Sequence, residues 1–244
     1  MENRFAIADS EKSFIDLKNY DKNKCFDNDL IEVQNFKDFI LQENYPCIGA
    51  TTSVNSRNIC IGVFDEMFSD KTIENLYWGV NKYIETLSKR KSMYLTYIAI
   101  FPQNEFNDEI QFENGLWKLL SKLHNIDKNY FEWDSKVSNN PESTEFSYSL
   151  GGESFFLVGM HPKSSRKARR FHVPAIAFNL HSQFEHLRSK GRYEITKNAV
   201  RANEILFQGS INPMLADHGE GLEAKQYSGR LVENSWECPF KHLI

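Results

Sequence analysis

SMYLTYIAIFP (residues 92–102) is almost continuously apolar from Tyr94 to Phe101. A short run of β-branched, aromatic and small apolar residues is typical of a strand that is buried on both faces. A strand of this kind has a neighbour on each side. We therefore predict that this segment is a central strand of a sheet.

The segments that flank this strand have helical spacing. DKTIENLYWGVNKYIETLSK (residues 70–89) precedes it, and DEIQFENGLWKLLSKLHNID (residues 108–127) follows it. Apolar residues recur in both at intervals of three and four, which predicts helices with one buried face. Ser69 or Asp70 is the expected N-cap of the first helix. LIEVQNFKDFIL (residues 30–41) predicts a third helix by the same spacing.

Short runs rich in β-branched and aromatic residues predict the remaining strands. They are YPCIGATTSV (45–54), NICIGVFD (58–65), EFSYSLGG (145–152), ESFFLVGM (153–160) and VPAIAFNL (173–180). The polar turn NSRN separates the first two, and the third and fourth are expected to pair. SNNPEST (138–144) is the clearest loop. Residues 181–206 have helical spacing again, with a break near Gly191.

Together these segments predict one α+β domain over residues 31–244, with a central mixed or antiparallel sheet flanked by helices. Residues 1–30 form a polar segment that we expect to be partly irregular. Gln208 to Ile244 has little regular pattern and predicts a long irregular C-terminal tail. A tail of this kind in a compact domain usually wraps the core or carries function.

The composition indicates a folded cytoplasmic protein. The chain has 19 Phe, 10 Tyr and 4 Trp, which supply enough apolar surface to offset the entropy of ordering the chain. No stretch approaches the roughly 20 apolar residues that cross a bilayer, and the N-terminus lacks the apolar run of a signal peptide. In a reducing compartment Cys25, Cys47, Cys60 and Cys238 should be free thiols, and none of their spacings matches a zinc or redox motif.

The net charge of −4 is unevenly distributed. Residues 160–204 hold ten Lys or Arg against three Glu, whereas the residues before them are acidic overall. Nucleic-acid binding needs a broad cationic surface, so we expect no nucleic-acid partner and instead a local anion site. In a helix, Arg166, Arg169 and Arg170 of HPKSSRKARRF would share one face and grip a dianion. A solvated basic turn is the plain alternative.

Histidines and carboxylates gather in the same half of the chain. Five of the seven histidines lie there, namely His161, His172, His181, His186 and His218. None has a zinc spacing, and each is more often a structural histidine than a metal ligand. Glu153 begins an apolar strand and is either an anion for a cationic substrate or an ion-pair partner of an arginine. The other carboxylates there include Glu185, Asp217 and Glu223.

A cysteine precedes a proline in WECPF, at Cys238 and Pro239. Proline fixes its own φ, lacks an N–H and biases the cysteine toward extended geometry, so the sulfur is held on a stiff backbone. This arrangement suits a thiolate that binds haem iron. A buried apolar cysteine is the alternative that the residues alone leave open.

Six segments, taken in order, resemble the YqcI/YcgG family of bacterial proteins. They are YPCIGATTSVN near residue 50, then GGESFFLVGMHPKSSRKARRF, AIAFNLHSQFEHLRSKGRYE, LFQGSINPMLADHG, EAKQYSGR and WECPF. The resemblance covers roughly residues 40–240. Leu180 stands where the family pattern has proline, and His218 stands where it has an aromatic residue; both departures bear on the substrate.

The resemblance implies a haem-dependent monooxygenase that hydroxylates a nitrogen of a guanidine, such as L-arginine or a derivative, or of another amine. It implies non-covalent haem b, dioxygen and an external electron donor such as a reductase or ferredoxin. A non-catalytic haem-binding or haem-sensing protein is the alternative. A binding module for an anionic metabolite that uses SSRKARR without iron is the third possibility.

The resemblance also implies roles for individual residues. Arg166, Arg169 and Arg170 would hold the haem propionates. Cys238 is the preferred axial ligand because a thiolate favours oxygen insertion, with His161, His181 and Cys47 as alternatives. Glu153 and Glu185 are the candidate carboxylates for a guanidinium group, and His218 is a candidate pocket-wall residue.

Overall fold

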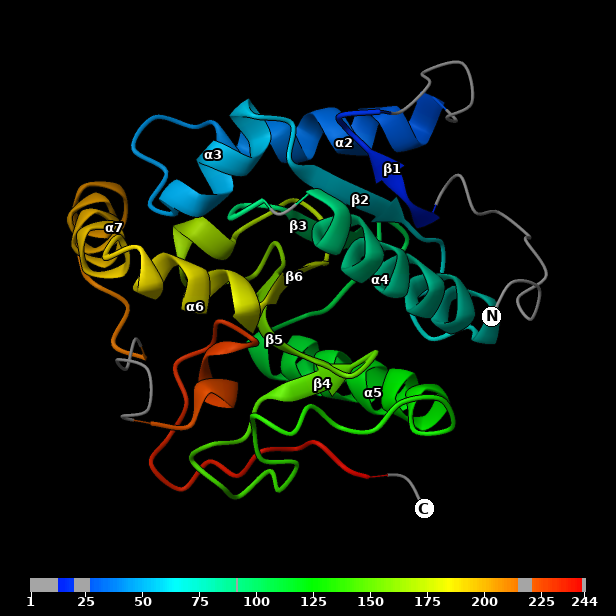
Figure 1. The fold of residues 1–244 in the computed structure, drawn as a ribbon. Coiled ribbons are helices and arrows are strands. Elements are labelled where there is room, and N and C mark those ends of the chain that lie inside the picture. Colours follow the sequence, from blue (N-terminus) through cyan, green and yellow to red (C-terminus); the bar gives the residue numbers. More distant parts are fainter. Residues whose placement is uncertain (1–12, 20–26, 91, 215–220, 243–244) are drawn as a thin grey trace.

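The computed structural model describes residues 13–19, 27–90, 92–214 and 221–242, which form one α+β domain around a mixed sheet (Figure 1). The strands are β1 (Ile15–Asp16), β2 (Ile59–Val63), β3 (Thr96–Ile100), β4 (Tyr148–Leu150), β5 (Glu153–Met160) and β6 (Ala175–Leu180). Their order in the sheet is β1-β2-β3-β6-β5-β4. β2 and β3 pair in parallel, and the other neighbouring strands pair antiparallel. The predicted fold class is confirmed.

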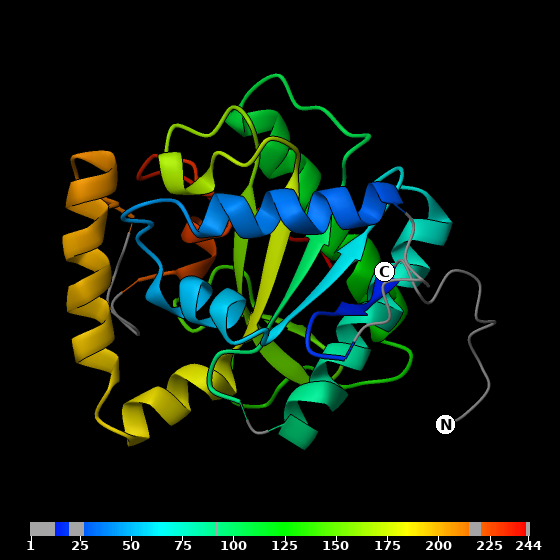
Figure 2. The ribbon, with the colours of Figure 1, turned by 90° about the horizontal axis from the view of Figure 1, so that it is seen from above.

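Helices cover both faces of this sheet (Figure 2). They are α2 (Asp27–Ile40), α3 (Ile48–Asn55), α4 (Asp70–Arg90), α5 (Glu109–Asp127), α6 (His181–Ser189) and α7 (Tyr193–Gln208), with short 3₁₀ helices η2 (Lys167–Arg169) and η3 (Glu223–Gln226). α2 and α3 lie on one face, α4 and α5 pack into the core on the other, and α6 and α7 lie at one end.

The central strand separates two hydrophobic cores. Ile98 of β3 packs with α2 in one core, whereas Tyr97 and Ala99 pack with α4 and α5 in the other. β2 alternates in the same way, because side chains along a strand point to opposite faces. Every residue of β2 and β3 is buried, so the prediction of a central strand buried on both faces is confirmed.

The segment YPCIGATTSV is a helix and not the predicted strand. α3 begins after Cys47, whose sulfur accepts a hydrogen bond from the Ala50 N–H at 3.4 Å. Thr51 and Ser53 donate their hydroxyl hydrogens to carbonyl oxygens of the preceding turn, which satisfies these polar side chains inside a helix. The β-branched residues favoured a strand, but local capping and tertiary packing override that preference.

Other local predictions are confirmed. Ser69 caps α4 by accepting a hydrogen bond from the Thr72 N–H at 3.2 Å. β4 and β5 pair across Gly151 and Gly152, and the helical stretch after β6 breaks at Gly191, which has a φ of +65° that glycine adopts readily.

The two ends of the chain pack against the domain. The polar segment over residues 1–30 contributes β1, where Asp16 forms an ion pair with Arg90, and the start of α2. The irregular tail after residue 208 wraps the core, since Tyr227 and Phe240 are buried in it.

Candidate functional site

Several of the segments that carry the quoted motifs, namely α3, α6, α7 and η2, lie together at one end of the molecule (Figures 1 and 2). α7 packs against α3, α6 and η2, and η3 packs against β5. Residues far apart in the sequence therefore line the same region. The side chains of this region are held by a dense set of polar contacts.

The three arginines of the basic segment do not share a free helical face. η2 is a single short turn, so the guanidinium groups diverge. Arg166 donates to Glu204 Oε1 at 3.1 Å and to the Ser210 carbonyl oxygen at 3.1 Å. Arg170, the most exposed of the three, donates to the carbonyl oxygens of Ser164 and Ser165.

Arg169 connects η2 to the tail. Its guanidinium donates to the carbonyl oxygens of Gly159 at 3.0 Å, Gln226 at 3.3 Å and Tyr227 at 3.4 Å. It also interacts electrostatically with Cys47, and burial lowers the pKa of Arg169. The arginine thus carries one positive charge into the space between α3, β5 and the tail.

Cys47 places its thiol at the N-terminus of α3. The residue is exposed by surface area, yet enough protein surrounds it for desolvation to raise the pKa of its thiol. The N–H groups of Ala50 and Gly49 and the charge of Arg169 oppose this rise in the pKa, because each favours the thiolate.

Cys238 has a different environment. It packs against the core beside Trp236, and burial raises the pKa of its thiol to about 12. The nearby carboxylate of Glu113 raises that pKa further, since two negative charges would lie close together. The Phe240 N–H opposes these effects. The thiol is therefore neutral in this arrangement.

Glu113 itself anchors the tail. Its Oε2 accepts from Arg230 Nη2 at 2.8 Å, and its Oε1 accepts from the Ser228 hydroxyl at 3.0 Å and from Trp236 Nε1 at 3.2 Å. The carboxylate and guanidinium are both largely buried. This buried ion pair fixes the tail against α5.

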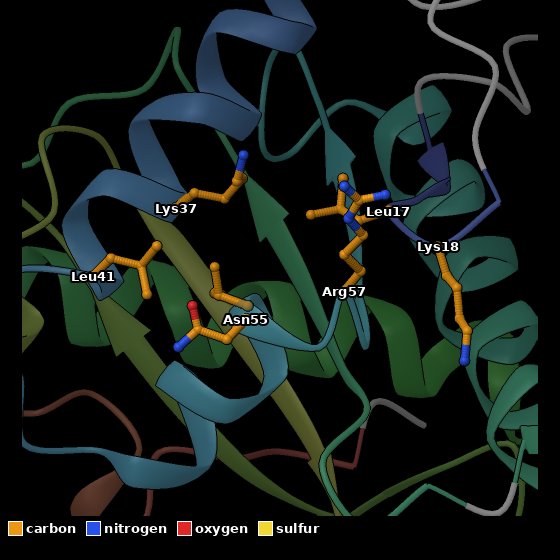
Figure 3. A pocket seen from close by; sticks show the side chains of 7 residues that line it. Leu17, Lys18, Lys37, Leu41, Asn55 and Arg57 are labelled. Atoms are coloured by element: carbon orange, nitrogen blue, oxygen red, sulfur yellow. The ribbon is translucent and has the colours of Figure 1, made fainter.

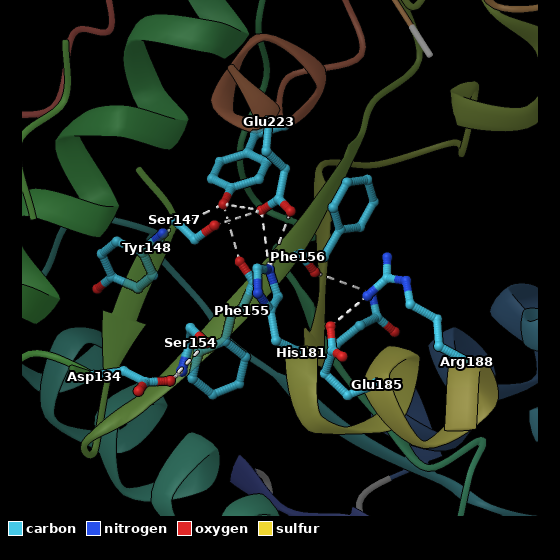
Figure 4. A network of polar contacts seen from close by, with 12 residues as sticks. Asp134, Ser147, Tyr148, Ser154, Phe155, Phe156, His181, Glu185, Arg188 and Glu223 are labelled. Carbon is cyan, nitrogen blue, oxygen red and sulfur yellow. Dashed lines mark hydrogen bonds and ion pairs between the residues drawn. The ribbon is translucent and has the colours of Figure 1, made fainter. Parts of the chain in front are cut away.

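A second polar network surrounds Glu223 (Figure 4). Its Oε1 lies 2.6 Å from the Tyr227 hydroxyl, 3.2 Å from the Ser147 hydroxyl and 3.1 Å from His181 Nε2. His181 is the first residue of α6 and directly follows β6. This position at the end of the strand places its imidazole beside the carboxylate of Glu223. Glu223 Oε2 has His181 as its partner among the described residues, at 3.1 Å. These donors fix the orientation of the carboxylate.

Tyr227 joins the two polar groups. Its backbone oxygen accepts from Arg169, and its hydroxyl donates to Glu223. Burial and then the charge of Glu223 raise the pKa of Tyr227 well above its ordinary value, so the phenol stays protonated and serves as a donor. Arg169, Tyr227, Glu223 and His181 therefore form one connected chain of contacts.

His161 is buried and stacks on Phe112, with ring centroids 4.3 Å apart. Neither ring nitrogen has a hydrogen-bond partner among the described residues, and neither does the buried Ser164 hydroxyl. Burial lowers the pKa of His161 to about 4, so the imidazole is neutral at pH 7. His181 is held by the carboxylate of Glu223, whereas His161 has no such partner among the described residues.

The remaining predicted site residues lie apart from these contacts. Glu185 is exposed and forms an ion pair with Arg188 on the surface of α6. Glu153 begins β5 opposite Leu150 and is partly exposed. His218 lies outside the described residues.

The sequence did not single out Glu223 and Tyr227 from their neighbours. The available signal was their position in EAKQYSGR, where Glu223 and Tyr227 are four residues apart and so lie on one side of a helical turn.

Leu180 donates its N–H to Tyr83 Oη at 3.4 Å, a contact that proline at this position would remove.

Two further findings concern metal-binding clusters and membrane-spanning helices. Among the described residues, His, Cys, Asp and Glu side chains nowhere gather in groups of three that could hold a metal ion. No described helix combines the length and apolar character needed to span a membrane.

Comparison with known proteins identifies the family. The chain is 27% identical over 212 residues to a Bacillus subtilis (strain 168) protein named Uncharacterized protein YqcI. The matched region covers 83% of this chain and 82% of that protein. No solved structure gives a significant match. The sequence description of the YqcI/YcgG family matches residues 36–241, which include every described element from α3 to η3. The chain belongs to the YqcI/YcgG family.

Proposed function

We propose that the end of the molecule formed by α3, α6, α7, η2 and η3 binds haem b. The protein with haem bound would hydroxylate a nitrogen of a guanidine substrate such as L-arginine or a derivative. The resemblance to haem-dependent N-hydroxylases implies this reaction. The observation that supports it most is the thiol of Cys47, an exposed residue whose sulfur accepts an N–H hydrogen bond at the N-terminus of α3.

Haem would supply the iron that activates dioxygen with electrons from an external donor such as a reductase or ferredoxin. Cys47 is our preferred residue to hold that iron because the residue is exposed and its sulfur is near N–H groups and Arg169, which favour the thiolate against the opposing effects of burial and Glu204. Cys238 packs against the core and lies near Glu113, which opposes a second negative charge. His181 is the alternative ligand, because a metal-binding imidazole commonly has a carboxylate partner such as Glu223.

The cations of the basic segment fit an anionic cofactor to different degrees. Arg170 is exposed, and its partners are two carbonyl oxygens, so it can exchange them for a propionate at low cost. Arg166 is tied to Glu204, and Arg169 holds three carbonyl oxygens. We therefore assign the propionate contact first to Arg170.

Glu223 is the carboxylate that best suits a guanidinium group. Its Oε1 is oriented by Ser147, Tyr227 and His181, whereas its Oε2 has one partner and retains capacity to accept another hydrogen bond. Glu185 faces solvent with Arg188, and water would screen its contact with a substrate. Glu223 would bind and orient the substrate, and His181 would keep the carboxylate in place.

The proposal is tested by turnover with the haem-loaded protein. L-arginine, dioxygen and a reducing system should give a product heavier by one oxygen atom. We expect Glu223→Gln to raise KM at least tenfold, because the neutral amide cannot pair with a guanidinium. Glu185→Gln is the matched control and should leave KM unchanged.

Two outcomes would contradict parts of this proposal. Haem binding without consumption of reductant, across a panel of guanidines and amines, would indicate a haem-binding or haem-sensing protein. Unchanged KM in Glu223→Gln together with a raised KM in Glu185→Gln would indicate that the substrate binds at the surface of α6 instead.

A further inference from the structure

A hollow lies at the C-terminal end of α3, whereas Cys47 caps the N-terminal end of that helix (Figure 3). It has a volume of about 420 Å³, which falls within the range of small-molecule pockets. It is lined by Leu17, Lys18, Lys37, Leu41, Val54, Asn55 and Arg57. These residues come from the turn after β1, the C-terminal end of α2 and the C-terminal end of α3. None of them belongs to the candidate haem site.

Three cations surround this hollow in a chain whose net charge is −4. Lys18, Lys37 and Arg57 have no ion-pair partner among residues 13–19, 27–90, 92–214 and 221–242. Lys37 donates to the side-chain oxygen of Gln34 at 3.0 Å, a neutral acceptor. A concave surface with charges of one sign focuses the field and attracts a counter-ion.

Lys37 lies in the last turn of α2, whereas the end of α3 does not need Arg57 as a capping cation. Basic residues often stabilise the carbonyl oxygens at a helix C-terminus. At the end of α3, however, the backbone N–H groups of Ser56, Asn58 and Arg57 already donate to the carbonyl oxygens of Thr52, Ser53 and Val54. The Lys37 ammonium donates to the side-chain oxygen of Gln34, a neutral group. Among the described residues no ion pair neutralises these positive charges, so they can meet an anionic ligand.

Arg57 has an unusual backbone conformation. Its φ is 55°, in the left-handed region, which disfavours residues other than glycine, asparagine and aspartate. Asparagine occupies neighbouring positions at Asn55 and Asn58, but an arginine stands at the strained one. The Arg57 and Asn58 N–H groups, which donate to the carbonyl oxygens of Val54 and Ser53, form the hydrogen-bond pattern that commonly ends a helix with a left-handed residue. This end of α3 accounts for the backbone conformation and places the Arg57 side chain at the hollow.

The floor of the hollow is apolar. Leu17 and Val54 are almost completely buried, and Leu41 remains exposed at the rim. An occupant should therefore combine a multiply charged anionic group with a compact apolar part. We propose that this hollow binds a phosphate monoester of a small organic molecule, with the phosphate near Arg57 and Lys37 and the organic part against the leucines. Guanidinium and ammonium groups are the usual phosphate ligands.

Phenyl phosphate is a suitable probe, because it joins a phosphate to one apolar ring. Calorimetric titration into the full chain should show saturable binding to one site. Binding should weaken as salt concentration rises, since screening reduces the attraction between exposed charges. Inorganic phosphate should bind at least tenfold more weakly, and benzyl alcohol should not bind.

Substitutions separate charge from folding. Arg57→Gln and Lys37→Gln should each weaken phenyl phosphate binding at least tenfold. Lys89→Gln is the matched control, because Lys89, like Lys37, is a lysine in the last turn of a helix but lies on α4. Arg57→Gly should raise the melting temperature by relieving the left-handed φ while still losing binding, so loss of affinity is distinguished from loss of fold.

Several results would overturn the proposal. These are absence of saturable binding at millimolar phenyl phosphate, unchanged affinity in Arg57→Gln, or an equal loss of affinity in Lys89→Gln. Inorganic phosphate that binds as tightly as phenyl phosphate would show that the apolar floor makes no contribution. The proposal does not depend on haem, so its failure leaves the proposed function untouched.

Discussion

His161 is the residue whose environment departs most from ordinary rules. Buried polar groups are normally hydrogen-bonded, yet both of its ring nitrogens lack partners among the described residues. The resemblance named it among the alternative haem ligands, but its burial and lack of partners could not be predicted from the sequence, because they depend on the packing of Phe112 against the end of β5. Its neutral, stacked imidazole makes stability depend on pH.

The pKa of His161, lowered to about 4 from near 6.5, sets the sign of that dependence. As pH falls from 6.5 toward 4, the unfolded chain takes up the proton first, so the folded state loses stability by up to about 1.4 kcal/mol per pH unit. His124, whose pKa burial also lowers to about 4, acts in the same direction. Asp127, whose pKa burial raises to about 6, has the opposite effect as pH falls below 6.

We predict that His161→Phe reduces the acid loss. Phenylalanine keeps the stacking on Phe112, cannot titrate and leaves no unpaired nitrogen. Urea unfolding at pH 7 and pH 4.5 should show a smaller fall in the free energy of unfolding than in the wild type, by about 1–3 kcal/mol. His186→Gln, at an exposed position, is the control and should follow the wild type. An unchanged pH dependence in His161→Phe would contradict this account.

At the scale of elements, α3 shows where sequence patterns mislead. β-branched residues in ATTSV favour a strand, but a short helix forms because Cys47 caps it and hydroxyl groups return to its carbonyl oxygens. β3, α4 and α5 were predictable because their periodic patterns are long and unambiguous. The single turn of η2 was not, since Arg166 and Arg169 each have separate tertiary partners.

The cap of α3 gives a second prediction. Cys47→Ser should keep the free energy of unfolding within about 0.5 kcal/mol of the wild type, because serine is a good N-cap. Cys47→Val should lose about 1 kcal/mol, since its side chain cannot accept the Ala50 N–H. Equal stabilities in urea unfolding would show that the sulfur does not cap the helix. The serine variant thus removes the thiol with the helix intact.

The tail gives a third prediction at this scale. Glu113→Ala should destabilise the protein by about 3–5 kcal/mol, because Arg230 would remain buried without its main anion. The double variant Glu113→Leu with Arg230→Met should recover much of that loss. Urea unfolding measures both. Equal stabilities of the single and double variants would contradict a tail held by this ion pair.

For the whole molecule, the sequence was sufficient to predict the α+β class, the central strand and the family, because each rests on long patterns. The arrangement of the candidate site was not predictable. Glu223, Tyr227 and His181 meet through a tail that has little periodicity, and the preference for Cys238 rested on its proline and not on its neighbours. Burial and nearby charge distinguish the surroundings of the two thiols, and these follow only from the fold.

The most direct test of the account is the absorption spectrum of the haem-loaded protein, reduced and exposed to carbon monoxide. Thiolate ligation predicts a red-shifted ferrous–CO band in the wild type, its loss in Cys47→Ser and its retention in Cys238→Ala. Retention of the band in Cys47→Ser with its loss in Cys238→Ala would indicate that Cys238 is the iron ligand. An unshifted band that is lost in His181→Ala would indicate that the His181 imidazole is the ligand. Absence of a Soret band in the wild type would contradict haem binding altogether.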